Sequence, residues 1–426
     1  MNENIFYDHL KKYLNDEEIA KLKKSLDETQ EYSCLILDTQ KLSSEKLLEI
    51  YPNLLHHPIV KNAFLFKKNE YDLGKSLLFE IGAFYILEPC SPLVCHFLDL
   101  KEDDLVLDMA AAPGGKCIHA SFCMNNKGQI LANEISSTRA EILSSNAEKY
   151  GRKNMIVCSG DTYELKKQFP NTFSKIILDA PCSGSGMFRK EKKMKEDWTI
   201  EKVNKLTSLQ KELILQAYFM LNEGGTLIYS TCSFSYEEDE EVIQYLLDNT
   251  DAILEPIPHF EGEFRSDMKE VVHLLPSHFN GEGHFIAKIK KPGKLVPKII
   301  SEREYISKNI PFKKLYKNAD QVIYLCNELI PLKHIRRLRT GIKLGEEDKK
   351  RGLIYDHAIS RYYPPLLQSV EVNENEAKEF IFGMPLNKVC NPGYVILTYL
   401  DIPFALGKAS NNVIKNHYPK GLRKRC

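Results

Sequence analysis

The sequence of 426 residues contains no long hydrophobic run. No stretch approaches the roughly 18 to 20 consecutive apolar residues that a membrane-spanning helix needs. The first residues, Met1-Asn2-Glu3-Asn4, lack the basic and then apolar layout of a signal peptide. We therefore expect a soluble, cytoplasmic protein that does not act at a membrane.

The 11 cysteines are scattered singly and form no CxxC or HxxxH pair. This spacing gives no support for a zinc site or a disulfide framework, so we expect no metal and mainly reduced core thiols. Hydrophobic residues make up 43% of the chain and charged residues 27%, which excludes a collagen-like or mainly disordered protein. The length predicts two or three domains.

The formal net charge is zero, with 58 basic and 58 acidic residues, but the charges are unevenly distributed. Residues 301–426 contain 22 Lys and Arg against 13 Asp and Glu, an excess of nine positive charges. A basic C-terminal third is typical of proteins that bind an anionic polymer, because neutralised phosphates release counterions. A basic, solvated surface without a partner is an equally good interpretation of the charge alone.

The pattern of apolar residues predicts four regions. Residues 1–80 look like a small N-terminal module, helical over its first 60 residues, with Asn15 or Asp16 and Ser43 as helix caps. Residues 81–292 contain short apolar runs followed by helical spacing, the pattern of parallel βα units. The runs lie at 105–108, 129–134, 155–158, 175–179 and 226–230, and segments 271–276 and 284–289 predict an antiparallel pair at one edge. A linker at 293–310 and a basic domain at 311–426, with a strand at 394–399, complete the chain.

Ligands of doubly wound α/β sheets bind beyond the carboxyl ends of the strands, so the residues after each run are the candidates for a site. The first run is followed by small residues and two glycines that allow close approach of a ligand to the backbone, in front of a helix N-terminus. These residues are Ala110, Ala111, Ala112, Pro113, Gly114, Gly115 and Lys116. The segment lacks the upstream glycine and the Lys-Ser/Thr ending of a P-loop, and a tight turn is the alternative interpretation.

Two carboxylates follow the next two runs. Glu134 lies 26 residues after Asp108, where such folds place an acid that binds both hydroxyls of a ribose. Asp161 follows the third run and suits an adenine amino group. A surface glutamate that caps a helix is the alternative for Glu134, although acids at three successive strand ends favour a ligand site.

The fourth and fifth runs each end near a cysteine. Asp179-Ala-Pro-Cys182 follows the fourth run and Ser230-Thr-Cys232 the fifth. A lone cysteine is most often a small buried hydrophobic residue. Two cysteines at neighbouring strand ends instead indicate reactive groups at the ligand crevice.

These segments resemble the motifs of a known family. Asp108-Met-Ala-Ala-Ala-Pro-Gly-Gly-Lys116, Asn133-Glu134-Ile-Ser, Asp179-Ala-Pro-Cys-Ser-Gly-Ser-Gly-Met-Phe-Arg-Lys190 and Ser230-Thr-Cys-Ser-Phe-Ser235 are similar to successive motifs of the RNA cytosine-5 methyltransferases of the NOL/NOP2/Sun family. The likeness covers about residues 80 to 290, including Glu88-Pro89, and the C-terminal tail resembles the bacterial ribosomal RNA branch of RsmF type. The family's usual Gln before Glu-Pro is Leu87 here, and its Arg-x-Asn-x-x-Lys appears as Ile36-Leu-Asp38-Thr-Gln-Lys41.

The resemblance implies a class I, Rossmann-like methyltransferase domain and a C-terminal α+β, PUA-like RNA-binding domain. It also implies S-adenosylmethionine as cofactor, bound by the segment 110–116 with Glu134, Asp161 and Asp179. By resemblance, the Cys232 thiolate attacks carbon 6 of cytosine, Asp179 holds the base edge and Cys182 assists product release. DNA cytosine-5 methyltransferases instead use the cysteine of a Pro-Cys motif, which would make Cys182 the nucleophile.

The target base must be single-stranded or flipped out to reach such a crevice. Two basic segments are candidate phosphate contacts, with exposed helix faces as the alternative. The first contains Arg189, Lys190, Lys192 and Lys193; the second, expected about a domain away, contains Arg336, Arg337 and Arg339 together with Lys415, Lys420 and Arg423. We expect a monomer that methylates small-subunit (16S) ribosomal RNA, free or in the subunit. Transfer RNA is the alternative substrate, and a non-catalytic ribosome-assembly factor is the alternative of another class.

Overall fold

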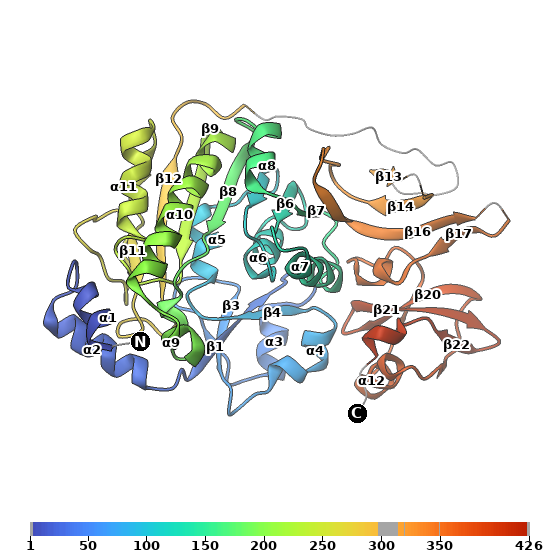
Figure 1. The fold of residues 1–426 in the computed structure, drawn as a ribbon. Helices are drawn as coiled ribbons and strands as arrows, with labels where there is room; N and C mark the ends of the chain where they lie inside the picture. Colours follow the sequence, from blue (N-terminus) through green and yellow to red (C-terminus); the bar gives the residue numbers. More distant parts are fainter. Residues whose placement is uncertain (1–2, 297–313, 319, 349, 424–426) are drawn as a thin grey trace.

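The computed structural model describes residues 3–296, 314–318, 320–348 and 350–423 (Figure 1). The predicted linker at 293–310 therefore lies outside the described residues from 297 onward. No helix within the described ranges has the length and apolar character needed to cross a membrane.

The N-terminal module is partly a β structure. Helices α1 (Glu3–Leu10) and α2 (Asp16–Asp27) precede a four-stranded sheet of order β2-β3-β1-β4. The strands are β1 (Tyr32–Leu37), β2 (Leu55–His56), β3 (Ala63–Lys67) and β4 (Phe84–Leu87), and short helices α3 (Ser44–Ile50), η1 (Leu73–Lys75) and α4 (Leu77–Glu80) connect them. The prediction of a helical segment over residues 1–60 was wrong for β1 and the short β2, because the apolar run of β1 is a buried strand rather than one side of a helix. The predicted caps are present, since Asn15 accepts from the Glu18 N–H and Ser43 from the Lys46 N–H.

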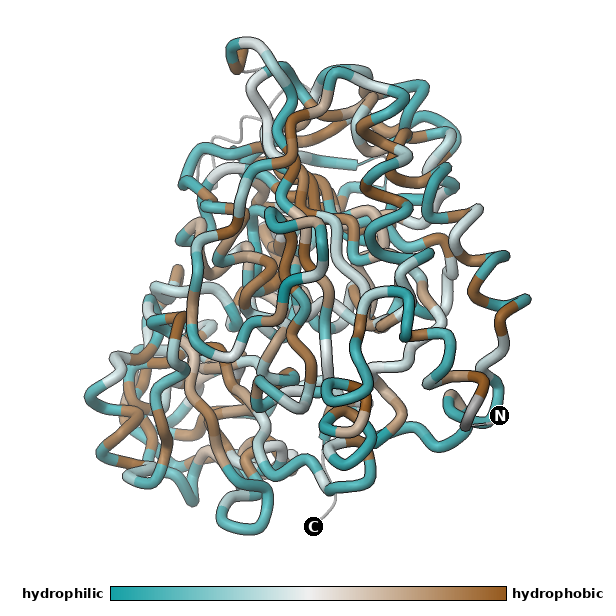
Figure 2. The backbone as a smooth tube through the Cα atoms, turned by 90° about the vertical axis from the view of Figure 1, so that its left-hand side faces the viewer, coloured by the Kyte–Doolittle hydropathy of each residue, from teal (hydrophilic) through white to brown (hydrophobic). Residues whose placement is uncertain are grey.

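The central sheet has the predicted doubly wound architecture. Its parallel strands run in the order β9-β8-β5-β6-β7. They are β5 (Leu105–Asp108), β6 (Gln129–Asn133), β7 (Met155–Ser159), β8 (Phe173–Asp179) and β9 (Leu221–Thr231). Successive residues of each strand face opposite sides, so Val106 packs in one hydrophobic core and Leu107 in the other. Figure 2 shows these central strands as the hydrophobic interior of the molecule.

Helices cover both faces of this sheet. The first core includes residues of α5 (Pro92–Leu98), α6 (Gly115–Cys123) and α7 (Ser137–Lys149). The second includes residues of α8 (Thr162–Gln168), α10 (Ile200–Met220) and α11 (Glu240–Asn249). A short turn η2 (Ser185–Met187) and helix α9 (Lys192–Glu196) follow β8.

Antiparallel strands flank the parallel strands on both sides. At one edge β12 (His284–Lys290) pairs with β9 and also with β11 (Val272–Leu274) and β10 (Ile253–Glu255), as predicted for the edge pair. At the other edge β15 (Arg336–Thr340) pairs with β7. The structure corrects the predicted placement of this basic segment, which was expected about a domain away but is hydrogen-bonded to the central sheet.

The C-terminal region forms two further sheets. One has the order β13-β14-β16-β17 and the other β18-β20-β21-β22-β19. The strands are β13 (Leu315–Lys317), β14 (Val322–Leu325), β16 (Ile342–Asp348), β17 (Gly352–Tyr355), β18 (Ser369–Glu371), β19 (Leu386–Asn387), β20 (Gly393–Tyr399), β21 (Ile402–Ser410) and β22 (Val413–Asn416), with η3 (His357–Arg361), α12 (Glu374–Phe382) and η4 (Lys420–Leu422). Strand β20 confirms the prediction for residues 394–399. One hydrophobic cluster joins this region to the N-terminal sheet, and Arg361 donates to the Glu80 carbonyl across the contact.

Candidate active site

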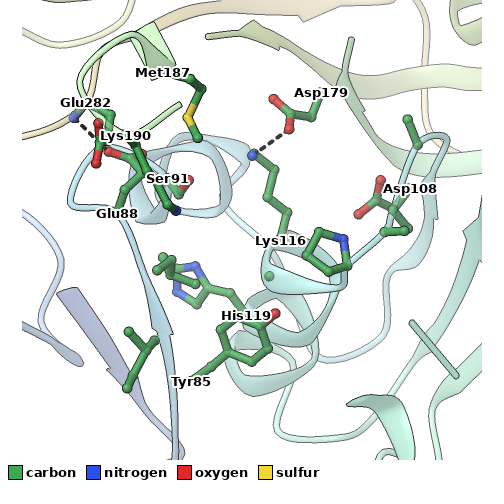
Figure 3. Close-up of a pocket in the computed structure, with 17 residues that line it drawn as sticks. Tyr85, Glu88, Ser91, Asp108, Lys116, His119, Asp179, Met187, Lys190 and Glu282 are labelled. Atoms are coloured by element: carbon green, nitrogen blue, oxygen red, sulfur yellow. Dashed lines mark hydrogen bonds and ion pairs between the residues drawn. The ribbon is translucent and has the colours of Figure 1, made fainter. Parts of the chain in front are cut away.

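A cavity of about 250 Å³ opens at the carboxyl edge of the central sheet, beside the ends of β5 and β8 (Figure 3). Its lining residues come from β4 and the turn after it, from the segment between β5 and α6, and from the loops after β8 and before β12. They are Tyr85, Ile86, Leu87, Glu88, Ser91, Asp108, Ala110, Ala111, Ala112, Pro113, Gly115, Lys116, His119, Asp179, Met187, Lys190 and Glu282. Six of the seven residues predicted between Ala110 and Lys116 therefore line the cavity; the seventh, Gly114, does not.

Gly114 instead caps α6 with a φ of 120°. The positive φ favours glycine here, and a Cβ would crowd the side-chain ends of Ile118 and Leu143 at 3.1 Å. Asp108, at the end of β5, is buried. Burial and the neighbouring Asp179 carboxylate raise its pKa to about 7.

Asp179 stands at the end of β8 within a set of polar partners. The Lys116 ammonium lies 2.7 Å from one carboxylate oxygen, and Ser230 Oγ donates to the other over 2.9 Å. His284 Nε2 lies 3.6 Å from the same carboxylate. Burial would raise the pKa of Asp179, but Lys116 and His284 outweigh it and hold that pKa well below its usual range. Asp179 is therefore an ionised acceptor at the cavity.

The two cysteines predicted as reactive groups lie side by side. Cys182 Sγ, after β8, is 3.1 Å from Cys232 Sγ, after β9. The hydrogen bond with Cys232 and burial raise the pKa of the Cys182 thiol well above its ordinary value. Cys182 therefore keeps its proton beside the Cys232 sulfur.

The predicted cofactor acids occupy the neighbouring strand ends without lining this cavity. Glu134 follows β6 and is buried; it accepts from the Ser136 N–H over 3.0 Å and lies 3.3 Å from Arg139. Asp161 is exposed after β7 and caps α8 by accepting from the Tyr163 N–H over 2.8 Å. Both lie on the carboxyl edge that the sequence predicted, where the backbone of the 110–116 segment and these acids can hold a nucleoside and its charged tail.

Comparisons with known proteins agree with this geometry. A model of the 16S rRNA methyltransferase RsmB/F family matches residues 95–290, and a model of the methyltransferase RsmF PUA domain matches residues 367–424. Ribosomal RNA small subunit methyltransferase F of Psychromonas ingrahamii is 33% identical over 392 residues, which cover 82% of this chain and 81% of that protein. The enzyme of the same name from Aliivibrio fischeri is 30% identical over 96% of this chain and 93% of its own length.

The chain belongs to the ribosomal RNA small subunit methyltransferase F family. A solved methyltransferase homologue from Pyrococcus horikoshii is similar with a TM-score of 0.60 and 29% identity, over 67% of this chain and 94% of that one. NSun6 from the same organism, solved with SFG, has a TM-score of 0.62 at 24% identity over 68% of this chain and 98% of that one, which supports the fold. The predicted family, the Rossmann-like fold of an S-adenosylmethionine-dependent methyltransferase and the PUA-like C-terminal domain are confirmed.

In this methyltransferase F family member, Glu238 connects the two cysteine loops. Its carboxylate accepts from the Ser183 N–H over 2.8 Å and from the hydroxyls of Ser183 and Ser233. Sequence reasoning missed Glu238, although it lies in the acidic run Glu237-Glu238-Asp239-Glu240-Glu241 directly after the fifth-strand motif. The acidic run could have indicated this role, because a carboxylate that is buried beside a loop needs hydrogen-bond donors from that loop.

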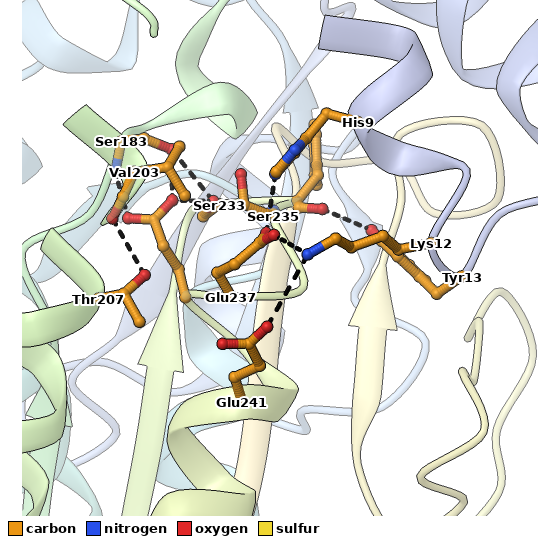
Figure 4. A network of polar contacts seen from close by, with 12 residues as sticks. His9, Lys12, Tyr13, Ser183, Val203, Thr207, Ser233, Ser235, Glu237 and Glu241 are labelled. Carbon is orange, nitrogen blue, oxygen red and sulfur yellow. Dashed lines mark hydrogen bonds and ion pairs between the residues drawn. The ribbon is translucent and has the colours of Figure 1, made fainter. Parts of the chain in front are cut away.

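The N-terminal helix region holds the Cys232 loop from the other side (Figure 4). Lys12 forms an ion pair with Glu237, and His9 Nε2 lies 2.8 Å from the same carboxylate. The Tyr13 hydroxyl donates to the Phe234 carbonyl over 2.8 Å. Burial would raise the pKa of Glu237, but hydrogen bonds from His9 and Lys12 lower it to about 2. The N-terminal module is thus part of the support of the active site.

Arg139 on α7 is another residue that sequence reasoning missed. Its guanidinium donates to the Ala112 carbonyl over 2.7 Å and lies 3.3 Å from Glu134. It therefore bridges the segment after β5 and the acid after β6. Two parts of the predicted cofactor site, the 110–116 segment and Glu134, are thus linked through Arg139.

The predicted RNA contacts fall into two groups. Lys190, Lys192, Lys193, Arg336, Lys415 and Lys420 are exposed. The other four are partly buried and donate within the protein: Arg189 to the Ser25 and Gly281 carbonyls, Arg337 to the Ile330 carbonyl, Arg339 to Ser144 and Glu148, and Arg423 to Asn416 and Tyr418. For these four, each guanidinium is held between elements of the fold, and the predicted phosphate contacts stay predictions.

The segment that resembles the family's Arg-x-Asn-x-x-Lys is also internal. Asp38 forms a buried ion pair with Arg152 over 2.7 Å. Lys41 is buried and donates to the carbonyls of Gly82 and Tyr150 over 3.1 and 3.2 Å. In this chain these side chains fix the N-terminal sheet to the end of α7.

Proposed function

We propose that this protein transfers a methyl group to carbon 5 of a cytidine in small-subunit ribosomal RNA through a covalent bond between Cys232 and the base. One observation carries the proposal. The thiol pair Cys182 and Cys232, 3.1 Å apart, lies at the strand ends that also hold the ionised Asp179 and Lys116. The family relatives are named for methylation of ribosomal RNA of the small subunit, which supports the choice of substrate.

The first step is nucleophilic addition. Carbon 5 of cytosine is a weak nucleophile, and addition of the Cys232 thiolate to carbon 6 makes it electron-rich. The new carbon–sulfur bond shifts the electron pair of the ring double bond toward carbon 5 and nitrogen 3. Asp179 accepts from the amino group of the base and from the proton that nitrogen 3 takes up from solvent as this charge develops.

S-adenosylmethionine supplies the electrophilic methyl group that carbon 5 receives. The residues present suit this cofactor, because the 110–116 segment exposes backbone at the N-terminus of α6 and Glu134 suits a ribose diol. We assign the methionine portion to residues 110–116 and Asp179, the ribose to Glu134 and the adenine to Asp161. Asp161 keeps one oxygen for this role, since its helix cap uses Oδ1.

In product release, water from the solvent takes the carbon 5 proton. The electron pair of that carbon–hydrogen bond restores the ring double bond as the carbon–sulfur bond breaks and Cys232 leaves as the thiolate. Cys182 is the group that assists this step, because it keeps its proton beside Cys232. Its S–H stabilises the departing thiolate by hydrogen bonding. Cys182 and Cys232 therefore have different roles, with attack assigned to Cys232.

RNA contacts outside the cavity are assigned to exposed cations. Lys190, Lys192 and Lys193 lie next to the cavity, and the C-terminal PUA-like domain carries Lys415 and Lys420. We further propose that the protein acts as a monomer in the cytoplasm on RNA of the small ribosomal subunit.

The proposal is tested by transfer of tritium from labelled S-adenosylmethionine to two substrates, free 16S ribosomal RNA and the small ribosomal subunit. Cys232→Ala serves as the inactive control, and bisulfite sequencing maps the modified cytidine. Label in carbon 5 of one or a few cytidines is the expected result. Label found only in transfer RNA, or no transfer at all, would contradict the proposal.

A further inference from the structure

Glu88 faces the cavity, yet the mechanism above gives it no role. It follows β4 and one of its carboxylate oxygens, Oε2, accepts from the Cys90 N–H over 2.9 Å and from the Glu282 N–H over 3.3 Å (Figure 3). The other oxygen, Oε1, is buried and has no hydrogen-bond partner among the described residues. A buried carboxylate oxygen without a donor is costly unless a ligand supplies one. Glu88 is thus held in place with a free acceptor at the cavity.

Glu282 forms the same wall of the cavity. Its side chain is 5% exposed, and its Oε2 is likewise buried without a partner among the described residues. Burial, with Glu88 as a nearby like charge and despite an opposing effect of Arg189, raises the pKa of Glu282. The wall therefore offers Oε1 of Glu88 as a free acceptor, next to Glu282, whose neutral form is favoured by burial.

This wall adjoins the nucleophile. The Gly186 N–H donates to the Cys232 carbonyl over 2.8 Å. A Cβ on Gly186 would lie 3.0 Å from that carbonyl oxygen and 3.3 Å from the Glu282 carbonyl oxygen, so the two backbones meet at Gly186. In Figure 3, Glu88 and Glu282 lie on one side of the Lys116 ammonium and Asp179 on another.

We propose that Glu88 accepts the second N–H of the amino group of the target cytosine and so selects cytidine over uridine. The inference rests on the proposed function. An amino group on the pyrimidine ring has two hydrogens in the ring plane, one beside nitrogen 3 and one beside carbon 5. Asp179 takes the first together with nitrogen 3, and Glu88 takes the second. Uridine presents a carbonyl oxygen in place of the amino group, and two carboxylates repel it.

The substitution Glu88→Gln tests this assignment sharply. The two backbone N–H groups at Oε2 fix the amide oxygen of a glutamine there, so its NH₂ group takes the place of Oε1 and points a donor at the cavity. Binding is measured in a Cys232→Ala background, with a 16S ribosomal RNA fragment that contains the mapped cytidine and with the same fragment carrying uridine. We expect the preference for cytidine over uridine to fall by at least about tenfold, because a good paired contact to a base edge is worth that much or more.

Glu102→Gln is the matched control, since Glu102 is an exposed carboxylate paired with Lys127 far from the cavity. It should leave both affinities unchanged. General damage to the fold by Glu88→Gln would weaken binding of both RNA fragments equally. An unchanged ratio of the two affinities would therefore overturn the proposal.

A second measurement separates the base from the cofactor. Calorimetry with S-adenosylhomocysteine should give the same affinity for the Glu88→Gln variant and the wild type. A parallel loss of cofactor affinity with an unchanged cytidine preference would assign Glu88 to the amino group of the cofactor instead. Failure of the wild type to methylate any RNA would refute the proposed function itself, and this inference with it, before the variant is compared.

Discussion

The Lys116 ammonium on α6 lies 2.7 Å from the carboxylate of Asp179 at the end of β8. This ion pair connects the segment assigned to the cofactor with the residue assigned to the base. Because Lys116 holds the pKa of Asp179 low, the carboxylate stays ionised throughout the pH range in which ribosomes are stable.

Lys116→Met should make methylation sensitive to acid. Loss of the cation raises the pKa of Asp179, so activity of the variant should fall toward pH 5, where the wild type keeps an ionised carboxylate. The pH profile of kcat/KM is measured by tritium transfer between pH 5 and 9. Lys101→Met, which removes an exposed lysine paired with Asp99, should leave the profile unchanged. An unchanged profile in Lys116→Met would contradict the role of the ion pair.

Glu238→Ala should lower both stability and activity. The substitution leaves the Ser183 N–H and the hydroxyls of Ser183 and Ser233 without their acceptor, which costs about 3 kcal/mol of unfolding free energy. Activity of the folded protein should fall at least about tenfold, because these residues adjoin the two cysteines. Urea denaturation and tritium transfer measure the two effects. Glu241→Ala, a more exposed neighbour, is the control, and equal behaviour of the two variants would refute this account.

Lys41 predicts a specific dependence of stability on pH. Burial lowers the pKa of its ammonium group to about 7 in the folded protein, against an ordinary value of 10.5. Between these values the unfolded chain binds more protons, so this group makes stability rise with pH, by about 1 kcal/mol per unit. Urea denaturation at pH 7.5 and 9 should show a rise in the free energy of unfolding of the wild type. The rise should be smaller in Lys41→Met, because the contribution of the Lys41 ammonium is removed. Identical slopes would indicate that the Lys41 ammonium stays protonated when buried.

Lys192 and Lys193 should contribute charge without contributing sequence selectivity. Both are exposed on α9 beside the active-site loop. Replacing both with Gln should weaken RNA binding and reduce the slope of log K against log salt by about 1 to 2, as expected for two phosphate contacts. Binding is measured between about 50 and 200 mM salt, over which such contacts are progressively screened. A weaker complex with an unchanged salt slope would argue against phosphate contacts.

The sequence predicted the parts of this protein that local patterns determine. The strands β5 to β9 and the edge pair of β11 and β12 follow from apolar runs and their spacing. The reactive loops were found because parallel strands place their carboxyl ends along one edge of the sheet. The pairing of Cys182 with Cys232 is a consequence of that topology and of the adjacency of β8 and β9.

The parts that could not be predicted depend on contacts between distant segments. Nothing local to Arg337 or Arg339 indicates that β15 pairs with β7 across more than 170 intervening residues. In the same way, the burial of Glu238 and Glu88 follows from how loops meet rather than from their immediate neighbours. Strand β1 was missed because it is a short run whose partners, β3 and β4, come later in the chain.

The covalent bond between Cys232 and cytosine is tested most directly by trapping the protein–RNA adduct. Wild type, Cys182→Ala and Cys232→Ala are incubated with 16S ribosomal RNA and S-adenosylmethionine, and the denaturation-resistant complex is quantified by gel and by mass spectrometry. Cys182→Ala should accumulate the adduct because release is slowed, whereas Cys232→Ala should form none and transfer no methyl group. An adduct that persists in Cys232→Ala and disappears in Cys182→Ala would show that Cys182 is the nucleophile and would contradict the account.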